Sequence, residues 1–443
     1  MLFIHLSDIH FRKTEVGQPD DPNKALRSDI VEDVKRMRMD IGKPADGIWL
    51  TGDVAFAGQA EEYDFAYRWL EETLCPAAGC RIENVFVIPG NHDVDRKIEA
   101  GPAQVIARQA LRNKPADQLD VEIGRWMRDK LSANLIFGPI DNYNRFAAKF
   151  LCPLRAYVDG AGEPSEAPAR PYATRDLTLD DGSTLRLWGF NTVLVSDASD
   201  AENTMLVDPA AAQIEHEDGV CHVVMAHHPF NWIKNKRAFE DRCNLMAKIQ
   251  LFGHEHTRRV EEARRHLRIR AGAMHPEKDQ PDWKPGYNWI DVSVATSSGK
   301  RRLKVRLWVR QYEVDSFLAV PDPDHNPVWE NSYDLPPWSA PEAPAAAVEA
   351  PAGEHKETRR EPQIMPISAP PPPSIRTVTI KLFKLKEHEQ RRLISHMKLD
   401  RPGDRDLKDY EIAIAAVKRS QEQGTLAEMD RLIEGMLAGG TLA

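Results

Sequence analysis

Short apolar runs alternate with helix-spaced segments along the first 90 residues of the chain. Apolar runs over residues 2–6, 47–50 and 85–88 are bounded by turn residues, a pattern typical of buried strands. Between these runs, residues 22–39 and 61–74 repeat apolar positions at helical spacing. The alternation of strands and helices predicts a layered α/β architecture.

This rhythm is interrupted between residues 94 and 168 and then resumes. We interpret the block as a helical insertion that caps a site, and a purely structural elaboration is the alternative. Its expected helices cover residues 103–111, 121–131 and 142–151. Asp180-Asp181-Gly182 then predicts a hairpin between two strands. The later elements of the core are a strand over residues 221–225 and a helix over residues 239–249.

Side chains that can bind a metal ion follow the apolar runs. Ligands bind at the carboxyl edge in open α/β sheets, so the position of these side chains is informative. Asp8 and His10 are alternate residues, which would point to the same side of an extended segment, and His254 and His256 repeat this spacing. The full set of donors is Asp8, His10, Asp53, Asn91, His92, His227, His254 and His256.

Composition narrows the class of protein. A hydrophobic fraction of 42% supports a sizeable core, and a net charge of -9 argues mildly against a protein that coats duplex nucleic acid through global charge. The five cysteines lack zinc-ribbon spacing, so we expect reduced thiols. We also expect a cytoplasmic protein without a membrane segment, because the first residues lack a signal-peptide pattern and no stretch approaches the roughly 20 apolar residues of a membrane span.

The ordered motifs Asp8-Ile9-His10, Gly52-Asp53, Gly90-Asn91-His92-Asp93, His227 and Gly253-His254-Glu255-His256 resemble the complete signature of the calcineurin-like metallophosphoesterases, over residues 1 to about 310. The resemblance implies a four-layer α/β/β/α sandwich that holds two metal ions at the sheet edges. By this resemblance, His92 is the catalytic histidine that binds no metal, and Asp93 supports the loop. One metal would be bound by Asp8, His10, Asp53 and His256, the other by Asp53, Asn91, His227 and His254. His228 is the alternative to His227.

Two divalent ions would lower the pKa of a bridging water, and the resulting hydroxide would attack a phosphodiester without a Ser or Cys nucleophile. Manganese is the preferred metal, with iron and zinc open. Without metal, we expect repulsion between Asp8 and Asp53, so that one of them keeps its proton. Arg96 is a candidate to hold a phosphate oxygen, and a salt bridge is its alternative. The basic residues between 258 and 270 either bind a polyanion or form a solvated surface.

These features predict an enzyme that hydrolyses phosphodiester bonds of nucleotides or nucleic acid. A cyclic-nucleotide or small-molecule phosphodiesterase and a nuclease are the alternatives within this class. A protein phosphatase and a non-catalytic binding module are less favoured, the first because its arginine-bearing extension is absent around residues 54–58, the second because the ligand set is intact.

The composition changes after Trp338. We predict a metallophosphoesterase domain over residues 1–335, a linker rich in Pro and Ala over residues 339–374, and a small helical domain over residues 375–443. Its expected helices cover residues 387–397, 404–423 and 426–437. This end resembles the short helical adaptor domains of effector enzymes in bacterial conflict systems, which implies a protein partner or self-association. A helical tail that folds back on the core is the alternative.

Overall fold

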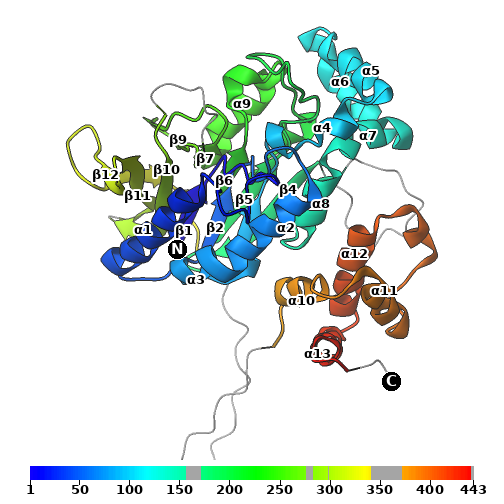
Figure 1. The fold of residues 1–443 in the computed structure, drawn as a ribbon. Helices are drawn as coiled ribbons and strands as arrows, with labels where there is room; N and C mark the ends of the chain where they lie inside the picture. The colour runs from blue at the N-terminus through cyan, green and yellow to red at the C-terminus, as the bar shows by residue number, and fades with distance from the viewer. Residues whose placement is uncertain (156–170, 276–282, 298, 341–371, 441–443) are drawn as a thin grey trace, which may run out of the picture.

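A computed structural model describes residues 1–155, 171–275, 283–297, 299–340 and 372–440 of the chain. Most of the predicted linker and the last part of the predicted insertion, residues 156–168, lie outside the described residues. The described residues form two β-sheets that share one hydrophobic core, helices on the outer faces and a separate group of C-terminal helices (Figure 1). The predicted four-layer α/β/β/α sandwich is confirmed.

The first sheet has seven strands in the order β12-β11-β10-β1-β2-β3, with β13 paired to β11. β1, β2 and β3 run parallel, so their carboxyl ends meet at one edge. All residues of these three strands are buried, which explains why they are continuous apolar runs. The strands are β1 (Leu2–Leu6), β2 (Gly47–Leu50), β3 (Val85–Val87), β10 (Gly286–Ser297), β11 (Lys300–Glu313), β12 (Ser316–Val320) and β13 (Trp329–Asp334).

The second sheet has six strands in the order β4-β5-β6-β7-β9-β8. Alternate side chains of β6 serve two clusters: Val223 and Met225 join the core between the sheets, whereas Val224 and Ala226 pack in a second cluster with helix α9 (Lys236–Met246). The strands are β4 (Tyr172–Thr178), β5 (Thr184–Phe190), β6 (Val220–Ala226), β7 (Ala247–Phe252), β8 (Arg259–Glu262) and β9 (Leu267–Arg270).

Helices α1 (Lys24–Ile41), α2 (Ala60–Trp69) and α3 (Cys75–Ala78) lie against the first sheet (Figure 1). A π-helical turn over Leu70–Leu74 joins α2 to α3. The helix predicted over residues 239–249 ends at Met246 instead, because Ala247 already begins β7. Among the described residues, no helix combines the length and the apolar content that crossing a bilayer requires.

The described part of the predicted insertion divides into two groups of helices. α5 (Pro102–Arg112), α6 (Ala116–Arg128) and α7 (Lys130–Phe137) pack on one another after the single turn of α4 (Arg96–Glu99). By contrast, α8 (Asp141–Ala148) packs into the main core, where the Tyr143 hydroxyl donates to the carbonyl of Val87 at 3.0 Å. α8 therefore supports the strand that leads to the Gly90–Asp93 loop.

The C-terminal helices form their own hydrophobic cluster and dock on the part of the chain that contains the two sheets. They are α10 (Ile375–Leu382), α11 (Glu387–His396), α12 (Asp409–Glu422) and α13 (Leu426–Leu437). Tyr410 and Ile414 of α12 pack on Ala148, and both the Tyr410 hydroxyl and the Lys408 ammonium bind Asp141 at the start of α8. These contacts agree with the alternative that the C-terminal segment folds back on the core.

Candidate metal centre

The structure brings all seven predicted ligands and the predicted catalytic histidine to the carboxyl ends of the parallel strands. Asp8, Asp53 and Asn91 follow β1, β2 and β3 of the first sheet. His227 and His254 follow β6 and β7 of the second sheet. The candidate centre therefore lies where the edges of the two sheets meet.

One group of donor atoms comes from Asp8, His10 and His256, whose ligand atoms lie within 4.8 Å of one another. His256 Nε2 is 3.3 Å from Asp8 Oδ1, and His10 Nε2 is 3.1 Å from Asp53 Oδ2. These four residues are the set predicted for the first metal.

A second group surrounds the side-chain oxygen of Asn91. Asn91 Oδ1 lies 3.0 Å from His227 Nε2 and 2.9 Å from His254 Nδ1. Asp53 Oδ2, which also belongs to the first group, is 3.4 Å from His227 Nε2. The set predicted for the second metal is thus assembled as well, and one carboxylate oxygen faces both groups.

The chemistry of the two groups fits divalent cations. Asp8 Oδ1 is buried and accepts no hydrogen bond of good geometry within the described residues. A buried carboxylate oxygen without a donor costs free energy, which a bound cation would offset. Mixed imidazole, carboxylate and amide donors suit manganese, iron or zinc.

The electrostatics of the centre differ from the expectation that Asp8 or Asp53 keeps a proton. Burial opposes ionisation of both carboxyls, yet the His256 imidazole at 3.3 Å lowers the pKa of Asp8 to about 2, and His227 and His92 hold the pKa of Asp53 well below its usual range. Burial also opposes the charge of His227, but the carboxylates of Asp53 and Asp8 raise its pKa to about 9. The expectation was wrong because protonated histidine compensates the two negative charges.

The hydrogen-bond partners of His227 and His228 bear on which of the two is the metal ligand. His227 Nδ1 faces the carbonyl of Thr51 at 2.7 Å, which directs Nε2 toward Asn91. His228 Nδ1 instead lies 2.9 Å from Thr192 Oγ1, although its ring centroid is 4.3 Å from that of His254. The contact with Asn91 favours His227 as the ligand, although the ligand atoms of His228, His227 and His254 also lie within 4.8 Å of one another.

Five of the predicted ligands have a left-handed backbone conformation. The φ angles are 55° for Asp8, 51° for His10, 53° for Asp53, 70° for His254 and 55° for His256. The alternate pairs therefore do not converge through an extended segment, as their spacing suggested, but through sharp turns at the ligands themselves. Such conformations cost free energy and occur where the surrounding structure enforces them.

The Gly90–Asp93 loop is locked to Asp53 and to helix α2. A Cβ atom on Gly90 would lie 2.1 Å from Asp53 Oδ1, so only glycine permits this approach. Asp93 accepts hydrogen bonds from the Gly90 amide at 2.8 Å, the Ala55 amide at 2.9 Å and the Tyr63 hydroxyl at 2.9 Å. The prediction that Asp93 supports the loop is confirmed.

Sequence reasoning missed the residues that orient His92. Its Nδ1 lies 2.8 Å from the carbonyl of Phe56, and the Phe56 ring stacks on the imidazole at 5.0 Å between centroids. The Arg12 guanidinium also lies over the Phe56 ring, at 3.7 Å from its centroid. A backbone carbonyl leaves no signal in the sequence, although Phe56 follows the Gly52-Asp53 motif closely.

The secondary candidates have structural roles. Arg96 donates to the carbonyl of Asn91 at 3.1 Å and thereby braces the ligand loop. Half of the basic run after His256 is paired: Arg259, Arg268 and Arg270 each lie 3.3 Å or less from a carboxylate oxygen of Glu261, and Arg270 also binds Glu255. These three of the six arginines are therefore held in ion pairs, whereas Arg264 and Arg265 are exposed.

Comparison with known proteins places the chain in a family. No curated protein matches it. Solved structures with a similar fold include vacuolar protein sorting 29 from Cryptosporidium parvum, which is 13% identical over 75% of this chain and 98% of that one, with a TM-score of 0.31. The zinc complex of Vps29 from Entamoeba histolytica is 10% identical over 75% and 99%, with a TM-score of 0.28.

A conserved uncharacterized protein from Streptococcus pneumoniae is 12% identical over 75% of this chain and 97% of that one, with a TM-score of 0.25. The model of the calcineurin-like phosphoesterase family matches residues 1–258, which is more than half of the 443 residues. Because this match covers more than half of the chain, the protein belongs to the calcineurin-like phosphoesterase family.

Proposed function

We propose that the protein is a dinuclear-metal phosphodiesterase that acts on nucleotides or nucleic acid. The observation that carries this proposal is the position of Asp53 Oδ2, which lies 3.1 Å from His10 Nε2 and 3.4 Å from His227 Nε2. These two histidines belong to different donor groups, so a single carboxylate oxygen stands between them. Two divalent ions held by these groups would share Asp53 as a ligand and would supply an activated water.

The residues around the centre divide the work of the reaction. When bound, two divalent ions would activate water and attract the phosphate. The Phe56 carbonyl fixes the ring of His92 through Nδ1, which makes Nε2 the atom that exchanges a proton or binds a phosphoryl oxygen. Arg96 and Asp93 hold the loop from both ends, so His92 keeps a fixed position relative to Asp53. The His92 amide donates to Asp53 Oδ1 at 2.7 Å.

The pairing of half of the basic run bears on the choice of substrate. The ion pairs of Arg259, Arg268 and Arg270 favour a compact phosphodiester, such as a cyclic nucleotide, over a long nucleic-acid strand. A nuclease is the second candidate, because Arg264 and Arg265 are exposed in the turn between β8 and β9. A cytoplasmic role as effector in a bacterial defence or signalling system, with a partner bound through residues 375–443, belongs to the same proposal and is supported by the resemblance of that segment to adaptor domains.

Hydrolysis of bis-(p-nitrophenyl) phosphate tests the proposal directly. The metal-stripped protein should be inactive and should recover with manganese, iron or zinc. Asp53→Asn should abolish the activity, whereas Asp20→Asn, at an exposed position away from the centre, should not change it. Inactivity with all three metals would refute the enzyme function.

The substrate class follows from a comparison of linear DNA, RNA and cyclic nucleotides at equal phosphate concentration. Preference for cyclic nucleotides would agree with the ion pairs of Arg259, Arg268 and Arg270. Preference for DNA or RNA, lost on substitution of Arg264 and Arg265 by glutamine, would establish the nuclease instead.

A further inference from the structure

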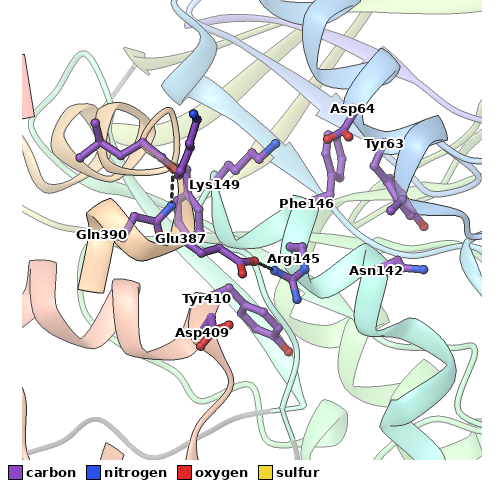
Figure 2. Close-up of a pocket in the computed structure, with 14 residues that line it drawn as sticks. Tyr63, Asp64, Asn142, Arg145, Phe146, Lys149, Glu387, Gln390, Asp409 and Tyr410 are labelled. Carbon is purple, nitrogen blue, oxygen red and sulfur yellow. Dashed lines mark hydrogen bonds and ion pairs between the residues drawn. The ribbon is translucent and has the colours of Figure 1, made fainter. Parts of the chain in front are cut away.

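A cavity of about 270 Å³ lies between the catalytic part and the C-terminal helices, away from the metal centre. Its walls come from α2, α8 and the segment that follows α8 on one side, and from the α10–α11 connection, α11 and α12 on the other (Figure 2). The volume equals that of about nine water molecules, so the cavity accommodates a ligand no larger than roughly a mononucleotide.

Some charged side chains of the lining form ion pairs, and others do not. Arg145 of α8 reaches Glu387 of α11 across the cavity at 2.5 Å (Figure 2), and Asp409 pairs with Arg391 at the same distance. The charges within each of these two ion pairs cancel.

Two lysines of the lining differ from these pairs. Within the described residues, neither the Lys149 nor the Lys386 side chain forms a hydrogen bond or an ion pair with a carboxylate. Lys149 is partly buried, and its ammonium lies 4.4 Å from the centroid of the Tyr67 ring. Arg391 pairs with Asp409 from outside the lining, so Asp64 is the one described lining carboxylate left to balance two ammonium groups, and the lining together with Arg391 carries one net positive charge.

Aromatic and aliphatic side chains form the rest of the wall. Phe146 and Tyr410 are buried, and Phe383 and Leu385 complete an apolar surface next to the lysines. We propose that this cavity binds a small organic phosphate, with the phosphate held by Lys149 and Lys386 and an aromatic ring packed on the apolar surface. A nucleoside monophosphate has this combination of charge, ring and size.

The same cavity is connected to the metal centre through two of its lining residues. The Tyr63 hydroxyl binds Asp93 of the ligand loop at 2.9 Å. The Asn142 amide donates to the carbonyl of Gly58 at 2.9 Å and to Asp95 at 3.2 Å, on either side of that loop in the chain. These contacts link the wall of the cavity to the supports of the loop, whereas the binding proposed here does not depend on the proposed function.

Calorimetric titration of the full-length, metal-loaded protein with adenosine monophosphate tests the inference. Lys149→Met and Lys386→Met should each weaken binding at this site at least about tenfold, the usual effect of losing one charge-assisted hydrogen bond. The control Lys384→Met removes an exposed lysine that pairs with Glu71 outside the cavity and should leave the affinity unchanged. Asp53→Asn, which removes binding at the metal centre, should also leave this site intact.

Two results would overturn the inference. The first is a dissociation constant above about 1 mM for adenosine monophosphate and the Asp53→Asn protein. The other is unchanged affinity in both lysine variants; the exposed Lys386 keeps this test valid if Lys149→Met fails to fold. Equal affinity for inorganic phosphate would refute the role of the apolar surface. If the protein binds adenosine monophosphate but has no hydrolytic activity, the proposed function is refuted and the proposed binding site is not.

Discussion

Replacement of Gly90 by alanine should disable the metal centre through one methyl group. The added Cβ would lie 2.1 Å from Asp53 Oδ1 and 2.5 Å from the Asp53 nitrogen, where ordinary contact begins near 3.4 Å. The loop and Asp53 must therefore separate by about 1.3 Å. Gly90 has a φ of -112°, so the effect is steric and not one of backbone preference.

Metal ligands tolerate displacements of about 0.2 Å, far less than this separation. A displacement of about 1 Å in a catalytic site costs on the order of a hundredfold in rate, or about 2.7 kcal/mol in the barrier. Gly90→Ala should therefore lose bound metal, measured by mass spectrometry, and at least a hundredfold of the hydrolysis rate. The matched control is Gly403→Ala, where a Cβ meets no atom within 4 Å. A Gly90→Ala protein with full metal content and a rate within threefold of the original would refute the steric argument.

Four further outcomes are expected. His92→Gln should lower kcat by about 10² to 10⁴ with unchanged metal content; loss of metal would show that His92 is a ligand. Tyr63→Phe removes one hydrogen bond to the Asp93 carboxylate and should cost about 1.5 to 3 kcal/mol in urea unfolding, and no change would exclude a supporting role. Burial raises the pKa of Asp208 to about 6, so ionisation of this carboxyl destabilises the fold as pH rises from 3.8 through 6. Asp208→Asn should therefore raise the free energy of unfolding by up to about 3 kcal/mol at pH 7.5 and leave it unchanged at pH 4. An equal gain at both pH values would contradict this. Chelator treatment should lower the Tm, because ions at a thousand times their Kd add about 4 kcal/mol, and an unchanged Tm would argue against bound metal.

The strands and their donor side chains were predictable because both signals are local. A fully buried strand such as β3 must be a continuous apolar run, and donors placed directly after it can only emerge at the sheet edge. Convergence of the second sheet on the first followed from the family resemblance and not from periodicity.

Other features depend on contacts that are distant in sequence. Helix α10 was missed because its eight residues include Val378 and Thr379, whose branched side chains favour helices little. Its formation is supported by the Ser374 cap and by packing with α12 and α13. The expectation that Asp8 or Asp53 keeps a proton failed for a similar reason, since the pKa of Asp8 depends on where His256 comes to lie.

The left-handed backbone at the ligands limits which residues these positions accept, before any metal chemistry is considered. Asp53 and His10, with φ near 50°, occupy a region that Gly and Asn enter easily and that branched residues avoid. In a saturation library scored only for the abundance of folded protein, Val, Ile and Thr should be depleted there while Gly and Asn persist. Evolution toward a metal-free relative would therefore pass first through asparagine and glycine.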